Sequence, residues 1–271
     1  MGNKLTESVR RAFLVLEAFS ITSPAMALQE VANKVGLPKV TTLRYLHTLM
    51  LLGYVLREGK SGLYRLGPKV LDMGFTVLGN MELRQVAMPY LDELSRISDQ
   101  NVSLGILDKT EIMYVERIRR RHIVNIYGVG SRVSSYRTSI GRALLAYLPE
   151  TKLRRLVAEI LKQPETAKHL GPKGERFFSL LKQVRQKGYA LINGEFIPGM
   201  RAIGAPVLDA KGVAEGAVNI SVYSAEVSLE KLVNRHVPLL LETVRKISLV
   251  RGCPPATAAV LGDIKTSQGP V

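Results

Sequence analysis

The sequence has 271 residues, 46% hydrophobic and 23% charged, a composition typical of folded proteins that excludes wholesale disorder. Its one cysteine, Cys253, excludes an internal disulfide and a cysteine-based zinc site, and it fits a cytoplasmic protein. No apolar run is long enough to span a bilayer. The 38 Lys and Arg residues outnumber the 23 Asp and Glu residues, and the net charge of +15 favours a polyanionic partner, with nucleic acid as the first candidate.

The first 66 residues predict three short helices followed by a β-hairpin. Apolar residues recur at helical spacing over 9–19 and again over 28–35, where Gly36 ends the pattern as a helix C-cap residue would. A third helix is expected over 39–52, and two β-prone runs flank a Gly-containing turn over 54–66. Three helices and a hairpin in this order are typical of a winged helix-turn-helix domain.

The rest of the chain predicts an α+β domain, and the length of the chain also suggests two domains. The connection at 108–110 is too short for a crossover, so the strands on either side of it are expected to be antiparallel. We expect helices over 68–80, 82–98, 139–147, 151–161, 175–188 and 228–250, and strands over 102–106, 112–114, 123–129, 189–196, 201–208 and 213–221. These elements predict a winged helix-turn-helix domain at 1–67, a linker helix at 68–84, a second domain at 85–252 and a flexible tail at 253–271.

The helix-turn-helix pattern at 28–52 is the most specific motif. A tight connection between two helices holds the second one at an angle that lets its N-terminal turn enter a major groove. Lys39 and Arg44 lie in this part of the helix beside the hydroxyls of Thr41 and Thr42. Arginine can donate two hydrogen bonds to a guanine edge, whereas Lys and Thr suit phosphates and thymine methyls. The alternative is an ordinary helical hairpin with charged outer faces.

Two further residues are candidate DNA contacts. Lys60 lies at the tip of the hairpin, where a wing would meet the minor groove or the phosphate backbone. The alternative for Lys60 is a solvated basic turn. His47 is expected on the surface of the third helix, where it either contacts DNA or stays in solvent.

From Ser8 to about Arg251 the sequence resembles the isocitrate-lyase-regulator (IclR) family of bacterial transcription factors. The matching motifs, in chain order, are LQEVANKVGLPKVTTLRYLHTLMLLGYV at 28–55, YRLG at 64–67, TSIGRALLA at 138–146, GYA at 188–190, EFIPGMR at 195–201 and APV at 205–207. Their order and spacing together are specific, although no single motif is decisive. The resemblance implies a homodimer or homotetramer that binds double-stranded operator DNA through the winged domain and a small organic acid in a C-terminal domain of GAF-like fold.

The third helix departs from the family pattern at two positions. Leu43 stands where the family often has a polar or aromatic residue facing DNA, and Val40 replaces a common Ser. The resemblance therefore implies that direct readout rests on thymine-methyl contacts and on Arg44 more than is usual in the family.

Two segments of the second domain predict a pocket for an organic acid. A polar loop leads into the helix that begins at Ser139, so the free N–H groups of Ser139, Ile140 and Gly141 can bind a carboxylate. Asn219 and Ser221 alternate with apolar neighbours, so they share one face of a strand. That face is either a pocket wall or simply the wet side of the strand.

The resemblance adds further expectations for this pocket. Asn193 and Glu195 match positions where the family carries acidic residues near the pocket. Ala202 stands where the family has Cys after Arg, so a contact through that thiol is absent. The segments 114–124 and 130–139 look closest to a subgroup that controls aromatic-acid catabolism, which favours an aromatic carboxylate as effector.

No catalytic residue, metal site or cofactor is predicted. The four histidines are scattered without metal-ligand spacing, and no nucleotide-binding or nucleophile motif is found. The alternatives to a regulator are a sequence-independent architectural DNA-binding protein and, with less support, an enzyme built on the second domain.

The charge is unevenly distributed. Residues 1–85 hold 11 basic and 6 acidic side chains, a net of +5, whereas residues 86–271 hold 27 and 17, a net of +10. Six of these ten charges come from 116–142, where seven arginines from Arg117 to Arg142 face only Glu116. This segment can attract DNA, form a subunit contact, favour an anionic effector or simply be solvated.

Overall fold

The computed structural model describes residues 5–120, 127–163, 165–259 and 261. The described residues form two compact units divided after Asn80, and each unit is described by itself. The division falls inside the predicted linker at 68–84.

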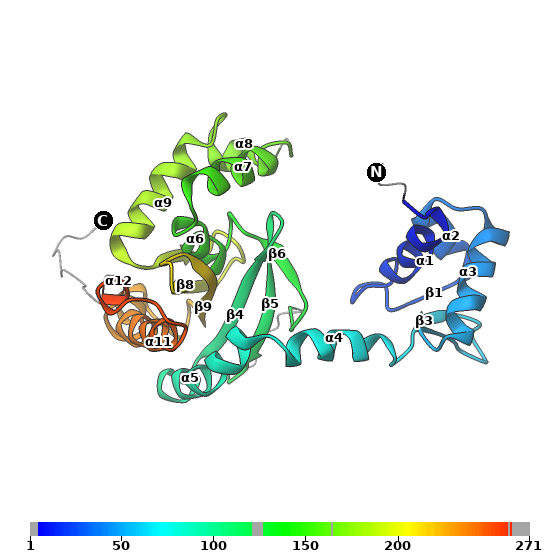
Figure 1. Cartoon of the computed structure of the whole chain (residues 1–271), viewed down its shortest axis with the longest axis horizontal. Coiled ribbons are helices and arrows are strands. Elements are labelled where there is room, and N and C mark those ends of the chain that lie inside the picture. The colour runs from blue at the N-terminus through cyan, green and yellow to red at the C-terminus, as the bar shows by residue number, and fades with distance from the viewer. Residues whose placement is uncertain (1–4, 121–126, 164, 260, 262–271) are drawn as a thin grey trace. The chain divides into compact units, whose positions relative to one another are not determined.

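The first unit is a three-helix bundle with a small sheet, the predicted winged helix-turn-helix (Figure 1). Its elements are α1 (Glu7–Glu17), β1 (Ala25–Met26), α2 (Leu28–Val35), α3 (Lys39–Leu51), β2 (Val55–Arg57), β3 (Tyr64–Leu66) and α4 (Val70–Gly79). Gly36 ends α2 with a φ of +66°, a backbone conformation in which glycine has no steric penalty. The core of the unit includes Val15, Val31, Leu46 and Val55, all fully buried.

Two features of this unit were not predicted in full. The two-residue strand β1 pairs with β3, which gives a three-stranded sheet in the order β1-β3-β2. Two residues are too few to produce a detectable alternation of polar and apolar side chains. Helix α4 forms as predicted but buries none of its side chains within this chain.

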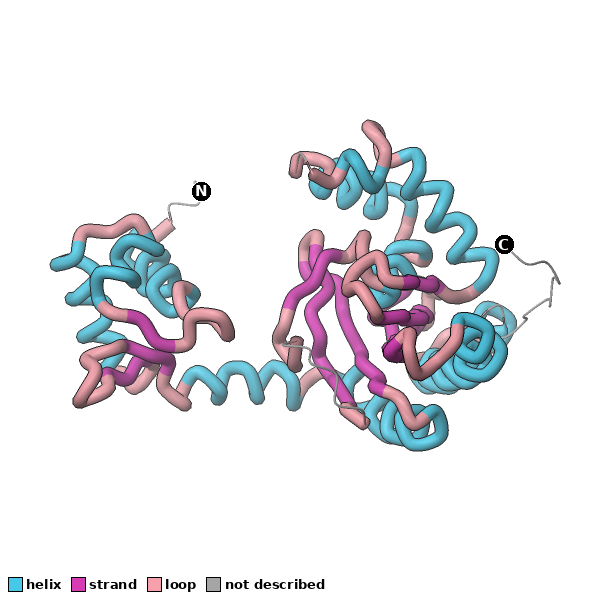
Figure 2. Tube along the Cα trace, turned by 180° about the vertical axis from the view of Figure 1, so that it is seen from behind, coloured by secondary structure: helices cyan, strands magenta, loops and turns pink. Residues whose placement is uncertain are grey.

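The second unit is built on a six-stranded antiparallel sheet in the order β6-β5-β4-β9-β8-β7, drawn in magenta in Figure 2. Its strands are β4 (Asn101–Asp108), β5 (Glu111–Ile118), β6 (Arg132–Ser134), β7 (Ala190–Asn193), β8 (Met200–Leu208) and β9 (Ala214–Tyr223). Its helical segments are α5 (Glu82–Ser98), α6 (Ser139–Ala146), α7 (Glu150–Ile160), α8 (Ala167–Leu170), α9 (Glu175–Lys187), α10 (Leu229–Lys231), the π-helix η1 (Leu232–His236), α11 (Val237–Val250) and α12 (Pro255–Ala259). The predicted α+β class is confirmed.

Helices cover both faces of this sheet (Figure 1). On the face covered by α5 and α11, the paired residues Val102, Ile220 and Ile203 are fully buried. On the opposite face, α6 packs so closely that a Cβ on Gly204 would lie 2.5 Å from the carbonyl carbon of Ser139. Glycine at this position therefore lets the first turn of α6 lie directly on the sheet.

Two predictions for this unit need correction. The strand expected at 123–129 lies partly outside the described residues, and its described part, 127–129, is not a strand; the sheet continues instead with β6. The tail expected from 253 onward begins with an ordered segment, because α12 packs on α11 and both Cys253 and Leu261 are buried. Small Ala-rich helices of this kind carry little hydrophobic periodicity, so a compositional argument misses them.

Candidate functional site

The exposed face of α3 carries the predicted DNA-contacting side chains. Val40, Leu43, Arg44 and His47 are all exposed and recur at the i, i+3, i+4, i+7 spacing of one helix face. Val40 is 72% exposed and Leu43 is 44% exposed, so both aliphatic side chains are accessible on this face. This face combines a guanidinium with apolar groups suited to thymine methyls.

Two neighbouring threonines in the first turn of α3 differ in their exposure. The Thr42 side chain is fully buried, and its hydroxyl donates to the Pro38 carbonyl at 3.1 Å, so it stabilises the helix and is not available to DNA. Thr41 is half-buried and Lys39 is exposed. The structure therefore keeps Lys39 and Thr41 on the accessible side of the turn and removes Thr42 from it.

The hairpin leaves Lys60 exposed between β2 and β3. The arginines on the strands are engaged within the domain. Arg57 donates to the Gly62 carbonyl at 3.3 Å and lies over the Tyr64 ring, and Arg65 pairs with Glu58 at 3.6 Å. Of these three basic residues, Lys60 is the one at the tip of the hairpin.

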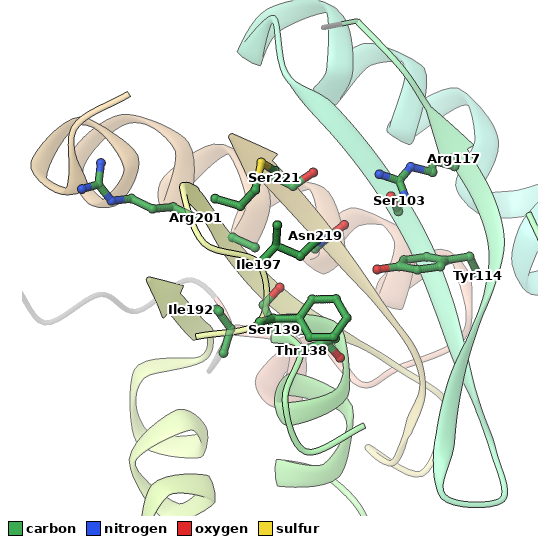
Figure 3. A pocket seen from close by; sticks show the side chains of 13 residues that line it. Ser103, Tyr114, Arg117, Thr138, Ser139, Ile192, Ile197, Arg201, Asn219 and Ser221 are labelled. Atoms are coloured by element: carbon green, nitrogen blue, oxygen red, sulfur yellow. The ribbon is translucent and has the colours of Figure 1, made fainter. Parts of the chain in front are cut away.

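A pocket lies in the second unit where the N-terminus of α6 meets the sheet (Figure 3). Its lining comes from β4, β5, β7, β8, β9, α6 and the segment around 196–197. The lining residues are Ser103, Tyr114, Arg117, Thr138, Ser139, Ile192, Phe196, Ile197, Met200, Arg201, Ala202, Asn219 and Ser221. The pocket thus joins an apolar wall to a set of hydroxyl, amide and guanidinium groups.

The start of α6 differs in detail from the prediction. The Thr138 hydroxyl caps the helix by accepting a hydrogen bond from the Gly141 N–H at 3.2 Å, so that N–H is not free. The N–H groups of Ser139 and Ile140 belong to the first turn, which precedes the helix's own hydrogen-bond ladder. Gly141 serves the fold instead, since a Cβ there would lie 1.9 Å from the Ser135 carbonyl oxygen.

Polar atoms without partners are concentrated in this pocket. Ser139 is 2% exposed and Asn219 is 7% exposed, and within the described residues neither the Ser139 Oγ nor the Asn219 Oδ1 has a hydrogen-bond partner. A buried polar group left unsatisfied costs about 1–3 kcal/mol, so these atoms mark a place where a polar ligand can bind. Ser221, the next inward-facing residue of β9, also lines the pocket.

Asn193 and Glu195 do not line this pocket. The Asn193 side chain accepts a hydrogen bond from Arg201 at 2.8 Å, and Glu195 pairs with Arg142 at 2.7 Å. The Ile140 side chain is fully buried, so this residue offers a ligand only its main chain. Ser139, Asn219 and Ser221 are thus the predicted residues that the fold brings together.

Sequence patterns missed Tyr114 and Arg117, which both line the pocket from β5. The two residues are three apart, and a regular strand would put them on opposite faces. The register between β4 and β5 shifts at Leu104 and Gly105, so Tyr114 pairs with Gly105 whereas Arg117 pairs with Ser103. This irregularity brings both side chains to one face, with the Arg117 guanidinium 5.4 Å from the Tyr114 ring centre.

The same irregularity points Glu116 to the other face of the sheet. Glu116 pairs with Arg84 of α5 at 2.7 Å, and Arg84 also donates to the Val115 carbonyl at 3.2 Å. Partial burial in the pocket wall lowers the pKa of Arg117 below its ordinary value, and burial raises the pKa of the Tyr114 hydroxyl above its own.

No group of three or more His, Cys, Asp or Glu side chains within the described ranges is placed to hold a metal ion. Among the helices of the same ranges, none is both long and apolar enough to cross a membrane.

Comparisons with known proteins cover nearly the whole chain. The IclR helix-turn-helix domain matches residues 8–59, and the C-terminal domain of bacterial transcriptional regulators of the IclR type matches residues 75–249. The Pca regulon regulatory protein of Pseudomonas putida is 31% identical over 89% of this chain and 82% of its own length. The regulator XynR of Escherichia coli is 33% identical over 85% of this chain and 91% of its own length. A crystal structure of an IclR family transcriptional regulator from Brucella abortus has a TM-score of 0.75 at 28% identity, covering 92% of this chain and 94% of that one.

Proposed function

This chain belongs to the IclR family of bacterial transcriptional regulators, and we propose that an organic acid bound beside α6 controls its affinity for operator DNA. The acid we favour is an aromatic carboxylate. The DNA contacts are assigned to Lys39, Val40, Thr41, Leu43, Arg44 and His47 of α3 and to Lys60 of the hairpin. The effector contacts are assigned to Ser139, Ile140, Asn219 and Ser221.

The observation that carries the proposal is the cluster of unsatisfied polar atoms at the start of α6. Ser139 and Asn219 line one pocket, at which the Ser139 hydroxyl and the first-turn N–H groups of α6 are the available donors. The N-terminal end of a helix dipole favours a negative charge, and a carboxylate offers these donors two acceptor oxygens.

The apolar part of the pocket supports an aromatic ligand. Tyr114, Phe196, Ile192, Ile197 and Met200 contribute its rings and aliphatic surfaces. Two such rings can pack against a third ring held between them. The relative from Pseudomonas putida that regulates the Pca regulon is in keeping with the resemblance of residues 114–139 to regulators of aromatic-acid catabolism.

A thermal-shift panel tests the effector class. Purified full-length protein is mixed with benzoates and with aliphatic acids of similar size, and the melting temperature is followed. A ligand that binds only the folded state stabilises it by about 2.7 kcal/mol at a hundred times its Kd, so an effector raises the melting temperature by several degrees. Asn219→Ala is expected to reduce this rise. A rise with aliphatic acids alone would exclude an aromatic effector, and no rise with any acid would exclude the pocket as an acid site.

The control of DNA affinity requires that the acid bind one arrangement of the protein better than another. A ligand with equal affinity for two states does not change their ratio, however tightly it binds. We assign these arrangements to a homodimer or homotetramer, in which two copies of α3 bind the two halves of a pseudo-palindromic operator. Half-sites about one helical turn apart, or a multiple of that, follow from this geometry.

A further inference from the structure

Arg117 is a half-buried cation whose guanidinium forms no ion pair with a carboxylate among the described residues. Among the described residues, neither its Nε nor its Nη1 has a hydrogen-bond partner, although both atoms are buried. Its guanidinium instead lies over the Tyr114 ring and lines the pocket (Figure 3). Buried donor atoms that lack hydrogen-bond partners are unfavourable, and an anionic ligand that accepts hydrogen bonds from them would compensate that cost.

The other arginines close to the pocket are already engaged. Arg201 donates to the Asn193 side chain and to the carbonyls of Ser224 and Val227, at 2.7–3.0 Å. Figure 3 shows its guanidinium pointing away from Asn219. Arg142 pairs with Glu195. Arg117 differs from both because, among the described residues, its buried Nε and Nη1 have no hydrogen-bond partner.

The strand register places Arg117 at the far side of the pocket from α6. Arg117 on β5 pairs with Ser103 on β4, Ser103 pairs with Asn219 on β9, and Asn219 pairs with Gly204 on β8. Ser139 lies directly over Gly204. With strands about 4.8 Å apart, Arg117 is roughly 10 Å from Asn219 and roughly 14 Å from Gly204 along the sheet.

This row has a donor group at each end and smaller polar groups between them. The start of α6 lies at one end, the Arg117 guanidinium at the other, and Ser103 and Asn219 between. We propose that the effector is an organic acid with two anionic groups, one held at the start of α6 and the other by Arg117. The inference deepens the proposed function and rests on it. The Arg117 side chain extends from β5 toward α6 and so shortens the distance that the effector must span. A single ring or a short carbon chain between the two anionic groups would then be long enough.

Matched pairs of acids test the proposal in the full-length protein. Benzoate is compared with benzene-1,3- and benzene-1,4-dicarboxylate, and hexanoate with hexanedioate, by isothermal titration calorimetry. A second charge-assisted hydrogen bond in a buried site makes at least one diacid bind about tenfold or more tightly than the monoacid of the same skeleton.

The variant Arg117→Met removes the charge and keeps a side chain of comparable length. We expect it to lose the preference for diacids, so that a diacid and the monoacid of the same skeleton bind with similar affinity. Since the buried Nε and Nη1 of Arg117 have no described hydrogen-bond partner to lose and a Met side chain can still pack on the Tyr114 ring, the melting temperature without ligand should change little. Arg119→Met is the control, because it removes a neighbouring charge from an exposed side chain that does not line the pocket. It should keep the diacid preference.

The outcomes separate the two proposals. Equal binding of monoacids and diacids, or a diacid preference that survives in Arg117→Met, overturns the assignment of Arg117 and leaves the acid site at α6 standing. A diacid preference lost equally in Arg119→Met also overturns it, since the effect would then come from the general charge of the segment. Failure of every acid to bind overturns the acid site and this inference together.

Discussion

Arg44 is the side chain of α3 on which operator specificity is expected to depend most. It is exposed on the same helix face as two aliphatic residues, Val40 and Leu43, which can contact thymine methyls but cannot donate hydrogen bonds. A guanidinium in this place can donate two parallel hydrogen bonds to a guanine edge.

The variant Arg44→Ala should weaken operator binding by about 1–3 kcal/mol, roughly 5- to 150-fold, and weaken binding to random DNA much less. Fluorescence anisotropy with operator and scrambled duplexes at fixed salt measures both affinities. Arg11→Ala is a matched control, because it removes an exposed positive charge from α1 that pairs with Glu7. Equal losses on the two duplexes in Arg44→Ala would show that Arg44 contacts phosphates only.

Neighbouring residues of the same type have different roles in this protein. Thr41 is accessible, whereas the hydroxyl of Thr42 is bound to the Pro38 carbonyl. The helical period itself indicates this difference, because Thr42 shares a face with the buried residues Leu46 and Leu49. The occupied N–H of Gly141 could not be foreseen in the same way, since it depends on the capping hydroxyl of Thr138.

Helix α4 presents apolar side chains that the described residues of the first unit leave exposed. Leu71, Met73, Phe75 and Val77 are each at least half exposed, with Phe75 at 65%. The opposite face is polar and carries Asp72 and Thr76. An apolar helix face of this size in water favours association, and a second copy of α4 would cover it symmetrically. We propose that this face contributes to the dimer.

Phe75→Glu is expected to weaken self-association at least tenfold, because it places a charge in a surface that would be buried. Sedimentation velocity over a range of protein concentrations measures the change. Thr76→Glu adds the same charge to the polar face and should leave the association constant unchanged. A dimer that persists in Phe75→Glu as in the unaltered protein would assign the interface to another surface.

The irregular pairing of β4 with β5 decides which residues of β5 enter the pocket. It turns Arg117 toward the pocket while Glu116 binds Arg84 near the start of α5. A ligand group at Arg117 would therefore bind next to a residue that anchors α5. Alternation of side chains along the sequence cannot reveal a one-residue shift of this kind, because the shift exists only in the pairing of two strands.

The net charge of +15 is shared between the two units in an unequal way. Several arginines of the basic segment 116–142 have partners in the second unit. Arg132 pairs with Asp108, Arg142 pairs with Glu195, and Arg119 donates to the Tyr127 carbonyl. Part of the charge excess thus stabilises the second unit itself, so total charge is a weaker indication of DNA binding than the face of α3.

Coupling between effector and operator must be reciprocal at the scale of the whole protein. If the acid changes operator affinity by some factor, the operator changes the affinity for the acid by the same factor, commonly 5- to 150-fold. The acid that gives the largest rise in melting temperature is titrated into the free protein and into the protein–operator complex. The ratio of the two acid affinities gives this factor. The ratio of the operator affinities with and without the acid should give the same factor. Identical acid affinities in the two titrations would exclude control of DNA binding by this pocket.

The winged helix-turn-helix, the exposed face of α3 and most of the helices and strands could be predicted from the sequence alone, because they depend on contacts between residues close in the chain. The resemblance to a known family added the expectation that the second domain has a GAF-like fold and binds an organic acid. Only the tertiary structure decided the composition of the pocket, where Ser139 from α6, Asn219 from β9 and Arg117 from β5 meet. These residues come from segments up to about a hundred residues apart in the sequence. They are brought together by strand pairing, by the register shift between β4 and β5 and by the close packing of α6 on Gly204. No local pattern carries that information, because it arises from how distant segments pack.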